Sequence, residues 1–318
     1  MLKTRRMLFN PRYLESLMAH LQAVRTTLQP QHTPYTQLTT YLDAHNQIAW
    51  GYMHAEPRPC FTGGLLREIV DWFGGIARSL DDPDGIDVNY VVVASAHPGV
   101  YNLGGDLNLF RQLIEARDRD SLYKYAQACI RPLFLNALHL NRPELKTITL
   151  VQGDALGGGF ECALSGNVVI AERGVKMGFP EILFNLFPGM GAMTLLGRKI
   201  GYTQAEKVIL SGRLYSAEEM HALGAVDILA EPGEGEQAVY EFVRKETRQR
   251  NGALALRAAR EIAQPISHDE LMRIAEIWVD AALRLEPKDL RMMERLVARQ
   301  TGKAEAAPAA AASNVFSA

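Results

Sequence analysis

The stretch GDALGGGFE, from Gly153 to Glu161, decides the fold. It directly follows the apolar and β-branched run Thr147–Val151, which is typical of a strand buried on both faces. Three consecutive glycines let the backbone approach another segment or a ligand closely, and they begin a helix whose first N–H groups lack intrahelical acceptors. Such amides, aided by the helix dipole, favour negative charge. Taken alone, the cluster is explained equally well by close packing of a helix on a strand.

Other glycine-rich or catalytic motifs do not match the chain. A Walker loop requires Gly-Lys-Ser/Thr and a dinucleotide loop requires G-x-G-x-x-G, and this stretch has neither. The segment Leu164-Ser165-Gly166 lacks the glycine that precedes the serine of a hydrolase nucleophile elbow by two positions. The HExxH motif is also absent. The glycine cluster is therefore not assigned to nucleotide binding or serine hydrolysis.

Hydrophobic patterning elsewhere predicts strands that alternate with helices. Residues 35–53 indicate strand, turn and strand, and Tyr90–Ala94 and Val168–Ala171 indicate further buried strands. Helical spacing covers Tyr13–Leu28, Gly64–Leu80, Leu107–Leu140, and, beyond Gly191, segments 205–210, 217–223, 238–249, 253–263, 269–285 and 290–300. Strands that alternate with helices imply parallel βαβ units. We therefore predict an α/β fold with a helical C-terminal part.

These patterns divide the chain into four regions. Residues 1–33 are predicted to form a helical extension, and residues 34–230 the α/β core. Residues 231–300 are predicted to form a helical region, and the small-residue stretch 301–318 a disordered tail.

Composition excludes several classes of protein. The 318 residues carry a net charge of -2, which gives no electrostatic reason to expect nucleic acid as a partner. The three cysteines lie far apart without a CxxC or Cys/His pattern, so we expect no metal site and a reducing, cytoplasmic location. The basic start is not followed by the apolar run of a signal peptide, and no stretch of about 18 apolar residues predicts a membrane span.

Further motifs flank the glycine cluster. Upstream, the strand Tyr90–Ala94 leads into a second glycine turn, Gly104-Gly105-Asp106. Downstream come Pro180-Glu181-Ile182, with Glu181 twenty residues after Glu161, and then Pro188-Gly189-Met190-Gly191. This ordered set of four blocks resembles the crotonase (enoyl-CoA hydratase/isomerase) superfamily over roughly residues 35–285. The resemblance implies a crotonase-like ββα spiral.

The resemblance also implies roles for individual residues. The amides of Gly105 and Gly158 would form an oxyanion hole for a thioester carbonyl, and Glu161 and Glu181 match the two catalytic acids of the hydratases. Two carboxyl groups with separated pKa values suit proton removal at an α carbon and protonation of a departing hydroxyl. We assign Glu181 as the base at the α carbon and Glu161 as the acid in dehydration, although the sequence does not fix that direction. Members of this superfamily are usually trimers or multiples of trimers, and the resemblance implies that residues 231–300 form the trimerisation and pocket-lid region.

One branch of the superfamily, the bacterial diffusible-signal-factor synthases, resembles the chain over nearly its whole length, including the run from His139 to Leu145 and the helix that bears Trp278. That likeness implies dehydration of a 3-hydroxyacyl-carrier-protein thioester, then hydrolysis that releases a cis-2-unsaturated fatty acid signal. It also makes Leu156, Trp278 and Leu296 candidates to line an acyl pocket. No resident cofactor is expected, because the substrate arrives on carrier-protein phosphopantetheine or on CoA.

Three functions therefore remain open. The first is the dehydratase with thioester hydrolysis. Leu107 stands where hydratases often carry a basic residue that helps to hold CoA, and this favours acyl carrier protein as the partner. The second is a plain enoyl-CoA hydratase or isomerase of fatty-acid metabolism. The third is a non-catalytic regulator on the same fold that binds a partner such as a signalling sensor protein.

Overall fold

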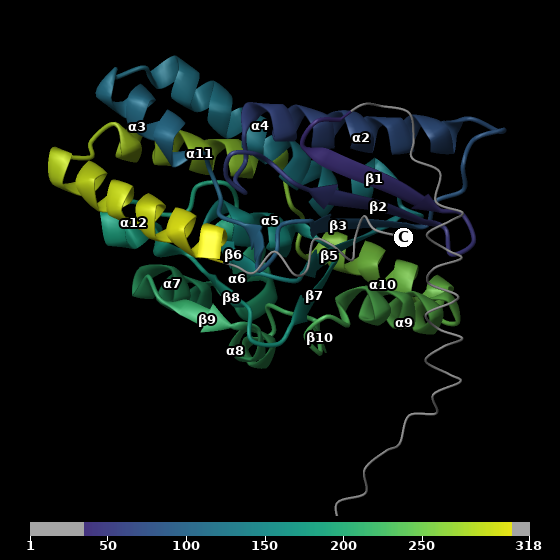
Figure 1. Ribbon diagram of the computed structural model, residues 1–318. Coiled ribbons are helices and arrows are strands. Elements are labelled where there is room, and N and C mark those ends of the chain that lie inside the picture. The colour runs from purple at the N-terminus through teal and green to yellow at the C-terminus, as the bar shows by residue number, and fades with distance from the viewer. Residues whose placement is uncertain (1–34, 307–318) are drawn as a thin grey trace, which may run out of the picture.

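The computed structural model describes residues 35–306 and contains two β-sheets surrounded by helices (Figure 1). The larger sheet has the strand order β1-β2-β3-β5-β7-β10. Strands β1 and β2 pair antiparallel, and every later neighbour pairs parallel. The bounds of these strands are β1 Leu38–Asp43, β2 Ile48–Met53, β3 Tyr90–Ser95, β5 Lys146–Val151, β7 Val168–Glu172 and β10 Ile228–Ala230.

The smaller sheet has the order β4-β6-β8-β9. Each of its first three strands follows a strand of the larger sheet within a few residues, so the chain passes from one sheet to the other three times. This repeated step, closed each time by helix, is the expected ββα spiral. The bounds are β4 Val100–Asn102, β6 Asp154–Leu156, β8 Lys176–Gly178 and β9 Leu214–Ser216.

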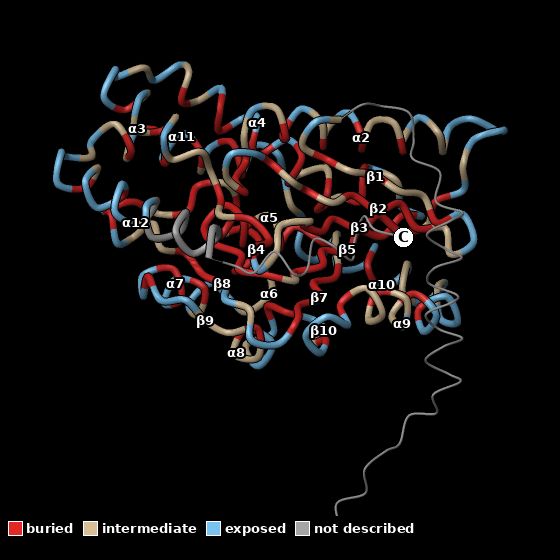
Figure 2. The backbone as a smooth tube through the Cα atoms, viewed as in Figure 1, coloured by how far each residue is buried: buried red, intermediate tan, exposed pale blue. Residues whose placement is uncertain are grey.

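Helices cover both faces of the larger sheet. Helices α2 and α4 lie on one side and α9 and α10 on the other (Figure 1), and the buried residues concentrate between these layers (Figure 2). Alternate residues of β3 pack on opposite faces of the sheet. Val91 and Val93 belong to the main core, whereas Val92 packs in the cluster that includes Val239 of α9. A strand buried on both faces needs an unbroken apolar run, which is why these strands could be recognised.

The helical elements complete the chain. Their bounds are α2 Gly63–Asp81, α3 Leu107–Glu115, α4 Arg119–Ala137, η1 His139–Asn141, α5 Gly158–Ser165, η2 Pro180–Phe184, α6 Ala192–Ile200, α7 Tyr202–Ser211, α8 Ala217–Leu223, α9 Gly235–Thr247, α10 Arg250–Ala263, α11 His268–Ala282 and α12 Pro287–Ala306.

The predicted fold class, an α/β body with a helical C-terminal part, is confirmed, and three details differ. The helical stretch 107–140 is interrupted near Arg117, which has a φ of 54°. Two three-residue strands, β9 and β10, lie in the region after Gly191 that was expected to be almost wholly helical, because so short a strand leaves little periodicity. Helix α12 extends to Ala306 and therefore into the first part of the expected disordered tail.

The predicted helix Tyr13–Leu28 lies outside the described residues. Within residues 35–306, no helix has both the length and the apolar composition that crossing a bilayer requires.

Candidate active site

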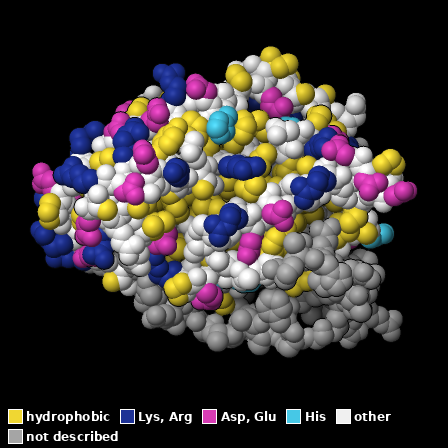
Figure 3. Space-filling model, turned by 90° about the horizontal axis from the view of Figure 1, so that it is seen from above, with side chains coloured by type: hydrophobic (Ala, Val, Ile, Leu, Met, Phe, Trp, Pro, Cys, Tyr) yellow, Lys and Arg dark blue, Asp and Glu magenta, His cyan; other side chains and the backbone are white. Residues whose placement is uncertain are grey.

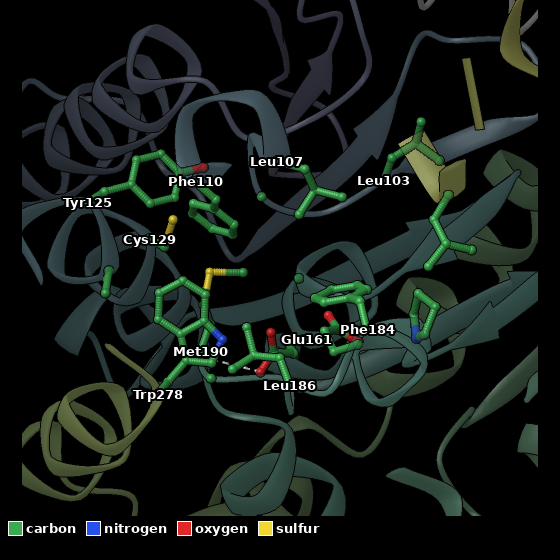
Figure 4. Close-up of a pocket in the computed structure, with 18 residues that line it drawn as sticks. Leu103, Leu107, Phe110, Tyr125, Cys129, Glu161, Phe184, Leu186, Met190 and Trp278 are labelled. Atoms are coloured by element: carbon green, nitrogen blue, oxygen red, sulfur yellow. Dashed lines mark hydrogen bonds between the residues drawn. The ribbon is translucent and has the colours of Figure 1, made fainter. Parts of the chain in front are cut away.

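One mostly apolar pocket collects the residues singled out in the sequence. The space between its walls, including the part open to solvent, is about 670 Å³. Six of the seven predicted residues line it, and only Leu156 does not (Figure 4). The lining residues are Leu103, Gly105, Leu107, Phe110, Tyr125, Ala126, Cys129, Gly157, Gly158, Glu161, Pro180, Glu181, Phe184, Leu186, Gly189, Met190, Trp278 and Leu296.

The two glycine turns meet at the pocket wall. Gly104 has a φ of 93°, and a Cβ atom on it would lie 2.9 Å from the amide nitrogen of Gly158. A Cβ atom on Gly158 would lie 3.4 Å from the amide nitrogen of Gly105. The backbones therefore touch without intervening side chains, and glycine is required there for close approach as well as for conformation.

The amides of Gly105 and Gly158 remain available to a ligand. Their neighbours are used internally: the amide of Gly104 donates to Oδ1 of Asn102 at 2.7 Å, and that of Asp106 donates to the Tyr125 hydroxyl at 3.0 Å. Within the described part of the chain, neither the Gly105 nor the Gly158 amide donates to a protein acceptor. Gly158 is the first residue of α5, where such an amide has no intrahelical acceptor.

Glu161 is a buried carboxyl group held by backbone amides. It lies in the first turn of α5 and is 1% exposed. Its Oε1 atom accepts hydrogen bonds from the amides of Met190 at 2.8 Å and Ala192 at 2.9 Å. Burial raises the pKa of Glu161 to about 7, and the backbone donors limit that rise because they stabilise the carboxylate.

Glu181 has less support for a negative charge. It lies in the first turn of η2, and its Oε2 atom is buried without a hydrogen-bond partner among the residues described. Burial and the nearby Glu161 carboxylate raise the pKa of Glu181 to about 8. Since Glu161 accepts two amide bonds and Glu181 Oε2 accepts none, the pair holds its last proton on Glu181.

Aromatic and aliphatic side chains form the rest of the wall. Trp278 of α11 lies over Gly189, where a Cβ atom would come within 2.3 Å of the indole, and its ring centroid is 4.9 Å from that of Phe110. Leu296 reaches the pocket from α12. These side chains come from distant parts of the chain and enclose a surface suited to an aliphatic ligand.

Leu156 is the one predicted site residue that does not line this pocket. Leu156 ends β6, is 6% exposed, and pairs with Gly178 of β8, so it is a strand residue beside the pocket rather than part of its lining. Several lining residues were not predicted, among them Phe110, Phe184, Leu186 and Met190. Of these, Met190 could have been predicted from the sequence, because it lies inside the Pro188–Gly191 block.

Among residues 35–306, no three His, Cys, Asp or Glu side chains are grouped so that they could hold a metal ion. The pocket itself presents two carboxyl groups and two backbone donors.

Comparison with known proteins identifies the family. The family model described as Enoyl-CoA hydratase/isomerase matches residues 76–277, which is more than half of the chain. The chain belongs to the enoyl-CoA hydratase/isomerase family. The Arabidopsis thaliana peroxisomal fatty acid beta-oxidation multifunctional protein AIM1 is 30% identical over 143 residues, which are 45% of this chain and 19% of AIM1. The chain thus aligns with about a fifth of the length of this plant relative.

Solved structures of this family share the fold. An enoyl-CoA hydratase from Bacillus halodurans superposes with a TM-score of 0.68 at 18% identity, covering 82% of this chain and 100% of its own. Pseudomonas aeruginosa DspI superposes with a TM-score of 0.60 at 23% identity, covering 86% and 98%. The expected crotonase-like architecture is confirmed by these neighbours.

Proposed function

We propose that this member of the hydratase/isomerase family dehydrates 3-hydroxyacyl thioesters. One observation carries the proposal: the buried carboxyl group of Glu161, the half-buried carboxyl group of Glu181 and two unused glycine amides line the same apolar pocket. That combination supplies proton transfer and stabilisation of oxyanion charge at one place. A pocket without the carboxyl pair would bind a thioester but would have no means of moving its protons.

The glycine amides are proposed to receive the thioester carbonyl oxygen. When a base removes the α proton, charge develops on that oxygen, and backbone N–H groups that are fixed in advance stabilise it without reorganisation. Loss of a single such donor in comparable sites costs about 3–4 kcal/mol of barrier. The amides of Gly104 and Asp106 hold the turn around Gly105, and the Gly157 amide, which donates to the Gly178 carbonyl, holds the turn before Gly158, so the two donors are preorganised.

The carboxyl pair is proposed to share one proton during the reaction. In the resting site that proton is on Glu181, so Glu181 is ready to protonate an α carbon and Glu161 is ready to activate water, as hydration requires. By microscopic reversibility, dehydration begins from the form with the proton on Glu161. Glu181 then removes the α proton and Glu161 protonates the leaving hydroxyl, which departs as water and leaves the 2-enoyl thioester. The roles assigned from the sequence are retained, but elimination starts from the minor protonation state.

We further propose that the protein hydrolyses the enoyl thioester that dehydration forms. Water would attack the enoyl carbonyl, the amides of Gly105 and Gly158 would stabilise the tetrahedral oxyanion, and the thiol would leave with a proton as the free acid forms. The support is the resemblance to the diffusible-signal-factor synthases and the residue after the second turn. Asp106 there is paired with Arg58 at 3.0 Å and caps α3, and Leu107 faces the pocket, so this position offers no cation to CoA. We therefore propose acyl carrier protein as the carrier.

Product analysis tests both parts. Purified protein is incubated with a 3-hydroxyacyl-carrier protein, and enoyl thioester and free acid are measured by mass spectrometry. Glu161→Gln and Glu181→Gln should each lower the rate of water loss by about 10²–10⁴-fold. Glu172→Gln is the matched control. Glu172 ends β7, is buried, and accepts a hydrogen bond from the Gly235 amide at the start of α9, away from the pocket.

The alternatives give different outcomes in the same assay. A plain hydratase or isomerase would form enoyl thioester without free acid, which contradicts the hydrolytic step alone. A non-catalytic regulator would show no turnover, and neither glutamine variant would lose a function. The structure disfavours the regulator, because holding the Glu161 and Glu181 carboxyl groups in an apolar pocket destabilises a fold and a pure binding protein gains nothing from it.

Assembly into a homotrimer, or a multiple of it, is proposed through the C-terminal helices. Helix α10 buries only Arg257, which donates to the carbonyls of Leu145 and Pro143, while Leu256 and Ile262 are 73% and 84% exposed. Single exposed apolar side chains are common on protein surfaces, but two large ones on one helix make α10 the candidate contact.

A further inference from the structure

A second apolar cavity lies directly behind the proposed active site. It is separate from the first pocket but shares three wall residues with it, Cys129, Gly158 and Met190. The remaining wall is formed by Phe61, Leu66, Ile69, Phe73, Val93, Pro132, Leu133, Asn136, Cys162 and Ser165, most of them from β3, α2, α4 and α5.

The cavity is internal. Its aliphatic and aromatic walls, such as Ile69, Phe73 and Leu133, are at most 4% exposed. On the outside of α2 and α4, charged side chains of both signs alternate with apolar ones (Figure 3). The wall that this cavity shares with the first pocket gives a ligand in that pocket a path into it.

Met190 is the movable part of the shared wall. Its amide is fixed on the Glu161 carboxylate, but its side chain projects into the pocket between the Cys129 thiol and the Glu161 carboxyl in the view of Figure 4. A Cβ atom on Gly158 would lie 2.0 Å from the Met190 methyl group, so that methyl rests on the glycine of the proposed oxyanion hole. Methionine has several rotatable bonds and no branch, so it can change rotamer while its backbone stays in place.

The far wall of the cavity is polar. Asn136 is 2% exposed, and its Nδ2 donates to the Ser165 hydroxyl at 2.8 Å, whereas its Oδ1 is buried without a partner among the residues described. An aliphatic group against this oxygen would leave the amide unsatisfied, which is unfavourable. The second cavity is thus apolar except at the wall with Asn136, where an aliphatic chain would stop.

We propose that the second cavity receives the distal part of a medium-length acyl chain, with Met190 as the gate and the Asn136 amide as the length limit. The proposal rests on the proposed function, since it assumes that the thioester carbonyl binds at Gly105 and Gly158. A chain that starts at that hole and continues past Met190 enters the second cavity directly, because Gly158 and Met190 belong to both walls. Short chains end in the first pocket and do not require the gate to move.

Filling the second cavity tests the proposal. Leu133→Phe on α4 and Ile69→Phe on α2 each add volume to it without altering a residue of the first pocket. The ratio of kcat/KM for twelve-carbon and six-carbon 3-hydroxyacyl thioesters is measured in each variant. Each buried methylene gives about fourfold in affinity, so exclusion of three methylenes should lower the ratio on the order of 50-fold. The six-carbon substrate is the internal control, because misfolding would lower both rates together.

Met190→Ala tests the gate, because it keeps the amide that holds Glu161 and removes the side chain. The ratio should rise at least several-fold, and an unchanged ratio would overturn the gating role. An unchanged ratio in both filling variants, with the six-carbon rate retained, would overturn the role of the cavity.

A binding measurement separates this inference from the proposed reaction. Calorimetry with saturated six-carbon and twelve-carbon acyl thioesters reports chain-length preference even when no turnover occurs. If binding of the longer chain alone weakens in Leu133→Phe and Ile69→Phe, the cavity proposal holds although the reaction fails. If the affinity for both chains is unchanged, the cavity proposal is wrong whatever the reaction.

Discussion

Gly157 leaves the space that the Glu181 carboxyl group needs: a Cβ atom on Gly157 would lie 2.3 Å from Oε1 of Glu181. The Gly157 amide is also fixed, since it donates to the carbonyl of Gly178 at 2.8 Å. Gly157 thus has two effects. Its hydrogen bond fixes the backbone just before the free amide of Gly158, and its lack of a side chain leaves room for the Glu181 carboxyl group. The glycine cluster and the Pro180–Ile182 block, about twenty residues apart in sequence, therefore lie in direct contact.

Gly157→Ala should therefore displace Glu181 and reduce dehydration. We expect a fall in kcat of about 10²-fold or more, because a positioned acid or base contributes about 10²–10⁴-fold. The backbone strain of an alanine at a φ of 54° lowers stability as well, so a control must share that strain. Gly174 has a φ of 83° and no atom within 4 Å of an added Cβ. Gly174→Ala should lose stability but retain kcat, and equal kcat losses in the two variants would contradict the steric argument.

The carboxyl pair predicts the pH dependence of kcat/KM. Activity requires one ionised and one protonated carboxyl group, and the pKa values are raised to about 7 for Glu161 and about 8 for Glu181. These apparent values belong to the pair as a unit. The profile should rise through about pH 7 and fall above about pH 8. A rate that stays level from roughly pH 6 to 9 would show that the pair does not control the reaction.

The same pKa values predict how stability changes with pH. Both carboxyl groups bind protons more tightly in the folded chain than in the unfolded chain, where their pKa is near 4.5. Between about pH 4.5 and 8 the folded state therefore holds more protons, and the free energy of unfolding decreases as pH rises. Glu181→Gln should remove part of this decrease and stabilise the protein at about pH 9 by up to a few kcal/mol. Urea denaturation at several pH values checks this, and an undiminished decrease in Glu181→Gln would contradict it.

Much of the architecture was predictable from local sequence. Strands such as β3 and β5 are continuous apolar runs because they are buried on both faces, and α2 repeats its apolar residues at helical spacing. Strands β9 and β10 were not predictable, because three residues carry almost no periodicity and form only where a neighbouring strand accepts them. The pairing of β8 with β9 depends on contacts that no local window contains.

The site was predictable where backbone geometry determines the residue. Glycines that must touch another backbone, and acids at fixed positions after them, appear as motifs, so Gly105, Gly158, Glu161 and Glu181 could be named. Apolar lining residues could not be named in the same way, because a leucine in a pocket and a leucine in the core look alike in sequence. Leu156 and Leu296 illustrate this, since only Leu296 lines the pocket.

These two leucines give a matched pair of variants. Leu296→Ala should raise KM for a medium-chain thioester several-fold with a small change in stability, because Leu296 is partly exposed at the pocket wall. Leu156→Ala should lower the free energy of unfolding by about 2–5 kcal/mol, as is usual for a buried leucine. Its KM should change less than that of Leu296→Ala. The opposite pattern, measured by steady-state kinetics and urea denaturation, would return Leu156 to the binding surface.

The exposed face of α10 gives the last prediction. Leu256→Glu and Ile262→Glu place charges where an interface would require apolar contact, so each should convert the assembly to smaller species in light scattering. Ile277→Glu is the control, because Ile277 is 60% exposed but lies on α11 rather than α10. If the mass is unchanged in both α10 variants, or falls only in Ile277→Glu, helix α10 is not the assembly surface.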